Sequence, residues 1–312
     1  MSLRENANMI MQAALAAAMP DAAVRAALEN ADFSDGKQVL VATGKAGWQM
    51  AKAAYELLGE RIDSGVVVTK YDHNRGPIGN LDIYEAGHPV PDANSFRGTQ
   101  AALDAVSGLQ AQDTVLFLLS GGGSALFEKP LIPEADLSRL TGELLASGAD
   151  ITEINTVRKR LSAVKGGRFA LHCTPAQVFA IVLSDVLGDR LDMIASGPAY
   201  PDSSTTEEAW TIVKKYNLTL TAQMEQLLQQ ETPKTLSNVQ THVTGSVRQL
   251  CAAAEKKCRE LGYETMVLTD QLSCTARDAG VFLSNIAGMY AGSGRKMAFI
   301  AGGETVVHLT GK

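Results

Sequence analysis

The chain has 312 residues, of which 46% are hydrophobic, and it carries a formal net charge of −6 with a sequence pI near 5.5. This composition predicts a globular protein of about two domains, and the scattered lysines and arginines argue against a nucleic-acid partner. No apolar run approaches the roughly 20 residues that span a bilayer, so we expect no membrane partner. The four cysteines form no CxxC pair, which argues against a zinc site or a disulfide framework and favours the cytoplasm.

The first candidate site is a lysine in a turn bracketed by glycines. Two alanine-rich helices are predicted at residues 3–18 and 21–30, where they would cover a sheet. The apolar run at 38–42 then predicts a buried strand, and a helix is predicted from 48 to about 58. Lys45 lies in the turn between them, where a cation and the amides of a helix start can act on one phosphate. The turn matches neither GxxxxGK[ST] nor GxGxxG, so a surface lysine beside a tight turn remains the alternative.

Two more short strands are predicted at residues 65–69 and 81–85, and a stiff loop, GHPVPDANS, follows at 87–95. Its two prolines fix the backbone before a polar side chain caps the next helix, which is predicted to end near Val106. His88 in this loop is a candidate for contact with a ligand. A structural hydrogen-bonding role for His88 is the alternative.

The stretch TVLFLLSGGGSALF at 114–127 organises the chain. Its apolar run predicts a fully buried strand of a parallel sheet, and the strand delivers a glycine-rich loop to the carboxyl edge, where open α/β sheets bind ligands. Glycines let successive amides turn toward an anion, and two serines add hydroxyl donors. We interpret the loop as a phosphate or carboxylate cradle, or else as a turn in which glycine serves geometry alone. It consists of Ser120, Gly121, Gly122, Gly123 and Ser124.

Charged residues are densest between 153 and 168, on and after a helix predicted at 150–161. A solvated helix face with internal ion pairs is one interpretation. The other is a surface that receives an anionic substrate or phosphate, because arginine can bind a carboxylate through two hydrogen bonds. The candidate residues for that role are Glu153, Asn155, Arg158 and Lys165.

Another buried strand is predicted at 177–183, and two aspartates follow it on a glycine-containing loop. Asp185 and Asp189 are placed to hold Mg²⁺ or to accept a proton, with Asp185 as the candidate metal ligand. Capping and turn formation are the rival explanation.

Beyond a break at Thr232-Pro233, strands and helices alternate to the end of the chain. We therefore predict an α/β protein with a large domain at 1–235 and the start of a smaller C-terminal α/β domain at 236–312.

Five long motifs, in order along the chain, resemble the class II glycerate 2-kinases, whose C-terminal part is called the MOFRL domain and which are often named hydroxypyruvate reductases. The motifs are GHPVPDANS at 87–95, LSGGGSAL at 119–126, INTVRKRLSAVKGG at 154–167, SDVLGDRLDMIASGP at 184–198 and AGGETVVHLTGK at 301–312.

The resemblance implies a Rossmann-like large domain and ATP-dependent phosphorylation of D-glycerate at its 2-hydroxyl, with Mg²⁺, in a cleft between two domains. By motif, Lys45 resembles the essential lysine and Asp189 the catalytic aspartate, while residues 120–124 resemble a phosphate or substrate loop. Positioned positive charge around a moving phosphoryl group suits this chemistry. The sequence does not divide the roles of orienting the hydroxyl and holding the metal between Asp185 and Asp189.

The chain also departs from the family pattern. Arg160 stands where relatives usually carry histidine, and the sequence stops at Lys312 where relatives continue, so we expect the C-terminal domain to be incomplete. The partners expected are glycerate and a nucleotide, with a homo-oligomer left open. Two other functions remain open: an NAD(P)H-dependent hydroxypyruvate reductase, which lacks support from any GxGxxG motif, and a ligand-binding regulatory module without turnover.

Overall fold

The structure is a computed structural model that describes residues 2–29, 31, 33, 35–184 and 191–307. Its contacts divide the chain into two compact units, and we describe each by itself. The sheet unit comprises Val24–Leu183 and Arg190–His242, and the small unit comprises Met1–Ala23, Ser184–Asp189 and Val243–Lys312. The first helix was predicted to belong to the large domain, whereas its contacts are with the small unit. The domain division near residue 235 stays a prediction.

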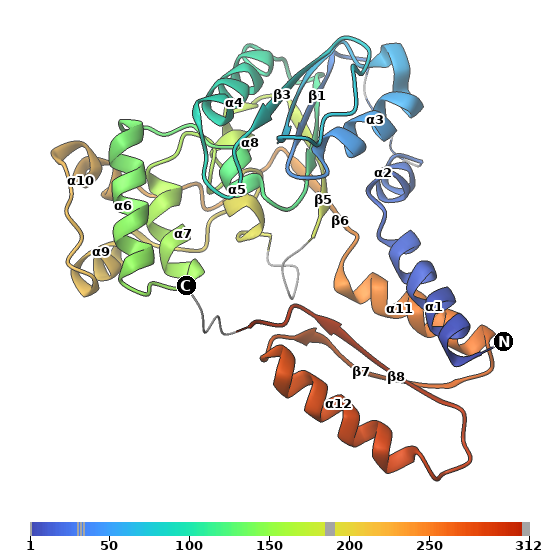
Figure 1. The fold of residues 1–312 in the computed structure, drawn as a ribbon. Helices are drawn as coiled ribbons and strands as arrows, with labels where there is room; N and C mark the ends of the chain where they lie inside the picture. Colours follow the sequence, from blue (N-terminus) through green and yellow to red (C-terminus); the bar gives the residue numbers. More distant parts are fainter. Residues whose placement is uncertain (1, 30, 32, 34, 185–190, 308–312) are drawn as a thin grey trace. The chain divides into compact units, whose positions relative to one another are not determined.

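Six strands form one sheet in the order β3-β2-β1-β4-β5-β6 (Figure 1). β1 pairs with β2 and β4, β2 with β3, and β4 with β5, all in parallel. This order is that of a doubly wound sheet, so the predicted α/β fold with a Rossmann-like parallel sheet is confirmed. The strands are β1 Gln38–Thr43, β2 Ser64–Lys70, β3 Leu81–Ala86, β4 Thr114–Leu119, β5 Gln177–Leu183 and β6 Val239–Thr244.

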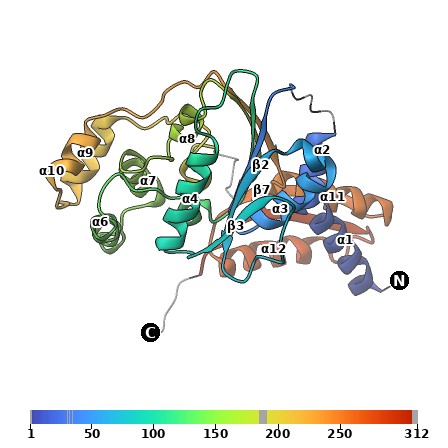
Figure 2. The same cartoon turned by 90° about the horizontal axis from the view of Figure 1, so that it is seen from above.

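Helices cover both faces of this sheet, and Figure 2 shows α3 and α4 on opposite sides. Successive strand residues point to opposite faces, so Leu40 and Leu116 pack with α3, whereas Phe117 stacks against Phe127 and Phe169 on the other face. Nearly every side chain of β1 and β4 is therefore buried, which explains their continuous apolar runs. The helices and 3₁₀ turns that surround the sheet are α2 Pro20–Leu28, α3 Gly47–Leu58, η1 Gly59–Arg61, α4 Ala93–Ala105, α5 Gly123–Leu126, α8 Arg168–His172 and η3 Ile194–Ser196.

Four further helices of the sheet unit pack on one another and form what we call the helical lobe. Its apolar core includes Leu140, Val157 and Met224, which are fully buried. Three of the helices begin with a capping box, at Asp150, Thr205 and Thr221, so their starts are fixed locally by sequence. The helices of the lobe are α6 Glu134–Ala146, α7 Ile151–Arg160, α9 Thr206–Lys215 and α10 Ala222–Leu228.

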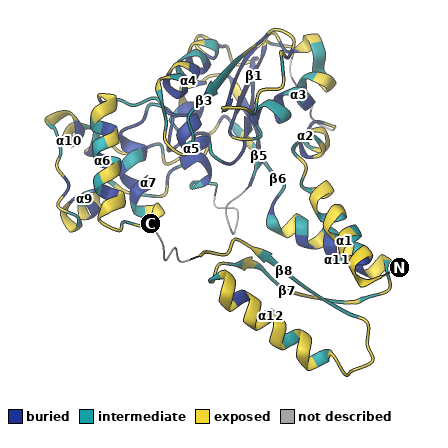
Figure 3. Cartoon of the chain, in the orientation of Figure 1, coloured by how far each residue is buried: buried dark blue, intermediate teal, exposed yellow. Residues whose placement is uncertain are grey.

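In the small unit, two parallel strands pair with each other and contact the helices α11 and α12. The helix α1 packs on α11, and Asn6 Nδ2 donates to Tyr263 Oη at 2.9 Å. These contacts make α1 part of the small unit, whereas the sequence predicts a helix that covers a sheet. The helix α12 buries only Ala279 among its residues, and Figure 3 shows its surface mostly exposed. No described helix is long and apolar enough to cross a membrane. The elements are α1 Leu3–Ala17, α11 Val247–Glu260, β7 Glu264–Leu272, α12 Ala276–Tyr290 and β8 Met297–Gly303.

Candidate active site

The strand order of the sheet reverses between β1 and β4, and the loops that follow these two strands lie side by side. Thr43 and Leu119, their last residues, are register partners. Lys45 N donates to Gly121 O at 2.8 Å, and Ser120 N donates to Thr43 O at 3.0 Å. In a doubly wound sheet such a reversal opens a crevice at the carboxyl edge, where ligands bind. The structure therefore brings Lys45 and the glycine loop to one place.

Two glycines allow these loops to approach so closely. Gly44 has φ of 111°, and a Cβ there would lie 2.4 Å from Ser120 O. Gly122 has φ of 88°, and a Cβ there would lie 3.0 Å from His88 Cδ2 and 3.2 Å from Lys45 Cγ. Any larger residue would clash or be strained at either position. The side chains of His88 and Lys45 thus converge on Gly122.

Lys45 and the glycine loop both carry donors that no described residue satisfies. The Lys45 side chain is exposed, and no residue in the described part of the chain forms an ion pair with it. None of the described residues accepts a hydrogen bond from the amides of Gly121, Gly122 or Gly123. A cation beside open backbone amides is an arrangement that binds an anion.

The hydroxyl of Ser120 is used within the protein. Its Oγ accepts from Ala46 N at 3.0 Å and donates to Thr43 O at 3.2 Å, so it fastens the two loops together. The sequence predicts this hydroxyl as a donor to an anion, whereas here it donates to Thr43 O within the protein. The amides of Gly121, Gly122 and Gly123 remain the donors of the loop that no described residue engages.

Ser124 begins a chain of polar groups that reaches into the sheet unit. Its Oγ lies 3.1 Å from Ser196 Oγ, which donates to Asn155 Oδ1 at 2.9 Å. Ser196 is fully buried with φ of 63°, and Ala195 before it has φ of 50°. Two consecutive residues other than glycine in this region store backbone strain, a feature that concentrates at functional sites. Ser196 was not among the predicted site residues, although it lies in a quoted family motif.

Arg158 and Lys165 hold the end of the glycine loop by hydrogen bonds to the backbone of Ser124. Lys165 Nζ donates to Ser124 O at 2.9 Å and to Phe127 O at 3.1 Å. Arg158 Nη2 donates to Glu128 Oε2 at 3.1 Å, and Lys165 Nζ lies 3.4 Å from the same oxygen. Burial lowers the pKa of the Lys165 ammonium to about 8, while the charge of Glu128 opposes that shift. These two cations are engaged inside the protein rather than free for a substrate.

Glu153 is held by the helical lobe. Its carboxylate accepts from Lys215 Nζ and from Tyr216 Oη, each at 2.7 Å. These hydrogen bonds, with Lys215 the larger cause, lower the pKa of Glu153 to about 2. The carboxylate thereby joins α7 to the end of α9, and its role toward a substrate stays a prediction.

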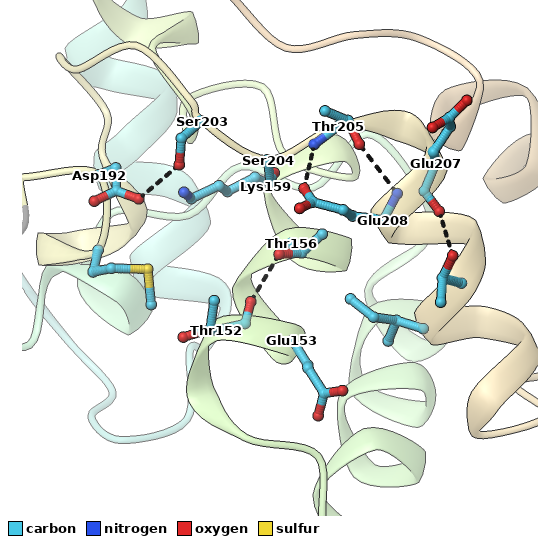
Figure 4. Close-up of a pocket in the computed structure, with 13 residues that line it drawn as sticks. Thr152, Glu153, Thr156, Lys159, Asp192, Ser203, Ser204, Thr205, Glu207 and Glu208 are labelled. Atoms are coloured by element: carbon cyan, nitrogen blue, oxygen red, sulfur yellow. Dashed lines mark hydrogen bonds between the residues drawn. The ribbon is translucent and has the colours of Figure 1, made fainter.

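Glu153 also lines a cavity of about 610 Å³ in the helical lobe. Figure 4 shows Thr152, Glu153 and Thr156 of α7 on one side, and Thr205 and Glu208 at the start of α9 near the other. The cation among its lining residues, Lys159, already donates to Asp202 Oδ1 at 2.9 Å. The carboxylates around this cavity make it a poor site for a phosphate.

The predicted aspartates Asp185 and Asp189 lie outside the described residues, so the structure does not place them. Within the described ranges, no group of three or more His, Cys, Asp or Glu residues is arranged to hold a metal ion. The predicted magnesium site therefore depends on these two aspartates.

Comparison with known proteins identifies the family. The family model described as "Domain of unknown function (DUF4147)" matches residues 6–229. A D-glycerate 2-kinase of Thermotoga maritima is 51% identical over 99% of this chain and 75% of its own length. The chain belongs to the glycerate 2-kinase family.

The fold agrees with this family, and its relatives carry two kinds of name. The crystal structure of a glycerate kinase from Thermotoga maritima is 50% identical, has a TM-score of 0.94, and is matched over 99% of this chain and 76% of that one. A protein of Agrobacterium vitis with a provisional name as a hydroxypyruvate reductase is 38% identical over 99% of this chain and 72% of its own length. The resemblance found in the sequence motifs is confirmed.

Proposed function

We propose that this protein transfers the γ-phosphoryl group of ATP to the 2-hydroxyl of D-glycerate, giving 2-phosphoglycerate and ADP. The observation that carries the proposal is the pairing of exposed Lys45 with the open amides of Gly121 to Gly123 at the switch point of the sheet. Relatives from the same family carry the name glycerate kinase, and both substrates are anions that such a site attracts.

The residues divide into groups that contact ligand and groups that hold them. In this proposal Lys45 stabilises negative charge on the transferring phosphoryl group, and the amides of the glycine loop bind phosphate or carboxylate oxygens. Ser124 contacts a glycerate hydroxyl, and the buried Ser196 and Asn155 position Ser124. Arg158 and Lys165 position the loop through Ser124 and Glu128.

The proposed phosphoryl transfer needs one base, which accepts the proton of the 2-hydroxyl. The oxygen of the 2-hydroxyl forms a bond to the γ-phosphorus as the bond from that phosphorus to the β-phosphate oxygen breaks. The hydroxyl proton passes to a base, and the electron pair leaves with ADP. Asp189 is the proposed base by motif, with Asp185 as the alternative.

We propose Mg²⁺ as the cofactor of this reaction. When bound, Mg²⁺ would offset the negative charge of the phosphates. Asp185 and Asp189 have the oxygen ligands that Mg²⁺ prefers. We also propose a cytoplasmic location, because the sequence lacks paired cysteines, and we leave a homo-oligomer open.

The test is product analysis with the purified protein, using D-glycerate and L-glycerate separately with ATP and magnesium. We expect ADP to form only when glycerate is present, and phosphorus NMR to show a phosphate ester at C2 of the D-enantiomer. Hydroxypyruvate with NADH or NADPH should cause no change in nicotinamide absorbance. Oxidation of the nicotinamide without ADP formation would establish the reductase instead, and binding of glycerate or ATP without product would favour a regulatory module.

A further inference from the structure

A second cavity, of about 280 Å³, lies against the first turn of α3 in the sheet unit. It forms where residues 71–76, after β2, fold back over that turn. Among its lining residues are Lys45, Trp48, Asp72, His73 and Arg75. Because Lys45 also reaches Gly122, the cavity adjoins the site proposed for phosphoryl transfer.

Two side-chain hydrogen bonds fasten the walls of this cavity. Trp48 Nε1 donates to Gly76 O at 2.8 Å, and His73 Nδ1 lies 2.7 Å from Lys45 O. One wall also packs on the hydrophobic core, since Trp48 contacts the cluster beneath α3. The indole ring is therefore held in place before any ligand arrives, which lowers the entropic cost of binding.

Two lining residues of the cavity carry charges that no other residue of the described chain pairs. Arg75 and Asp72 are both exposed, and neither forms an ion pair with another residue of the described ranges. Asp72 also has φ of 65°, in the left-handed region. A guanidinium, a carboxylate and an indole thus surround one space beside Lys45.

We propose that this cavity binds the nucleoside part of the nucleotide, an inference that rests on the proposed kinase function. A base can stack on the indole or on the planar guanidinium, and a carboxylate accepts hydrogen bonds from ribose hydroxyls or from an amino group of the base. A bare polyphosphate has no base to stack on the indole and no ribose hydroxyl to donate to Asp72. The volume falls just below the roughly 300–1,000 Å³ of sites for whole drug-sized ligands, so it suits one portion of a nucleotide.

This placement gives the nucleotide a direction. Base and ribose occupy the cavity at Trp48 and Arg75, and the phosphates extend past Lys45 toward Gly122. Lys45 then lies between the nucleoside and the glycine loop, as the proposed transfer of the terminal phosphoryl group requires.

Tryptophan fluorescence tests the proposal directly, because the chain has two tryptophans. The other, Trp210, packs in the helical lobe, so a Trp210→Phe variant leaves Trp48 as the reporter. We expect ADP to change the Trp48 emission in a saturable way, and inorganic triphosphate to leave it unchanged. If Trp210→Phe does not fold, the ADP-dependent change must instead disappear in Trp48→Phe. An equal response to triphosphate, or no response to ADP, would overturn the proposal.

Kinetics separate this inference from the function on which it rests. Arg75→Gln should raise KM for ATP about tenfold, the order of one lost cation–π contact, with kcat and KM for glycerate unchanged. Arg97→Gln, an exposed arginine on α4, is the matched control and should leave all three constants unchanged. If Arg75→Gln keeps glycerate kinase activity with an unaltered KM for ATP, the nucleoside does not bind in this cavity, and the proposed kinase function still stands. Absence of kinase activity in the unmodified protein would refute the function, and ADP fluorescence would still test the cavity.

Discussion

Two groups of cations in the sheet unit have opposite surroundings. Lys159, Arg160 and Lys165, on α7 and in the turn after it, have side chains that are at most 3% exposed. Each is paired, Lys159 with Asp202 at 2.9 Å, Arg160 with Glu231 at 3.2 Å, and Lys165 with Glu128. Lys45 and Arg75 are exposed, and neither has an ion-pair partner among the described residues.

The difference separates cations that stabilise the fold from cations that are available to a ligand. Burying a charge is costly unless a partner and hydrogen bonds offset the loss of water, so buried cations are already committed. A cation without an ion-pair partner at the carboxyl edge of a parallel sheet can bind a phosphate group of a ligand. The density of charge along the sequence is therefore a poor guide to the site, and pairing is a better one.

The largest effect is expected at the unpaired lysine. Lys45→Met should lower kcat with glycerate and ATP roughly 10³-fold, the order seen when one charge-stabilising donor is lost. The thermal midpoint should stay within a few degrees, because Lys45 is exposed. Lys37→Met changes an exposed lysine at the other end of β1 and serves as the control. Near-normal kcat in Lys45→Met would make this lysine a surface residue.

Substitution of a buried, paired cation should lower the stability of the fold. Lys159→Met leaves the buried Asp202 carboxylate without its closest cation, and we expect a loss of roughly 3 kcal/mol in the free energy of unfolding. Lys214→Met, on an exposed face of α9, should change it by less than about 0.5 kcal/mol. Chemical denaturation measures both. A Lys159→Met protein of normal stability that has lost its activity would place α7 in the site and break the comparison.

Ser196 tests whether a buried residue can affect ligand binding, because it is buried but is bonded to Ser124 of the glycine loop. Ser196→Ala keeps the backbone but removes the bonds to Ser124 and Asn155. One buried acceptor is left unsatisfied, which costs about 1–3 kcal/mol. We expect KM for glycerate to rise about tenfold or more with KM for ATP unchanged, whereas the exposed Ser147→Ala should change neither. An effect on stability alone would make Ser196 purely structural.

The smallest effect concerns pH. Burial lowers the pKa of Lys165 to about 8, so the folded protein loses this proton between pH 8 and the usual lysine range while the unfolded chain keeps it. The unfolded state then binds more protons, and the contribution of Lys165 to stability rises with pH in this window. Activity should fall several-fold there, because Ser124 and Glu128 lose a charged partner. Lysine-selective carbon NMR and a pH–rate profile should give the same midpoint, and a normal lysine pKa would contradict the assignment.

Several parts of this structure follow from sequence pattern alone. The apolar runs of β1 and β4, each ending in glycine, predict buried parallel strands with loops at one edge, and the loops of Lys45 and Gly122 are found there. Capping residues such as Asp150 mark helix starts because their hydrogen bonds are local.

Other features depend on contacts that periodicity does not encode. Helical spacing shows which face carries Arg158 but not that Glu128, thirty residues earlier, covers it. Gly197 marks a turn after Ser196, but nothing in the sequence shows that Ala195 and Ser196 also adopt positive φ, and Arg75 lies in a loop without a motif. Long-range packing decides which charged side chains become buried.

Lysine footprinting with an amine-acylating reagent, read by peptide mass spectrometry, tests the central claim most directly. In the free protein, Lys45 and Lys37 should both react, and buried Lys159 and Lys165 should not. A non-hydrolysable ATP analogue with glycerate should protect Lys45 and leave Lys37 reactive. Equal labelling of Lys45 with and without these ligands would contradict the assignment of the site.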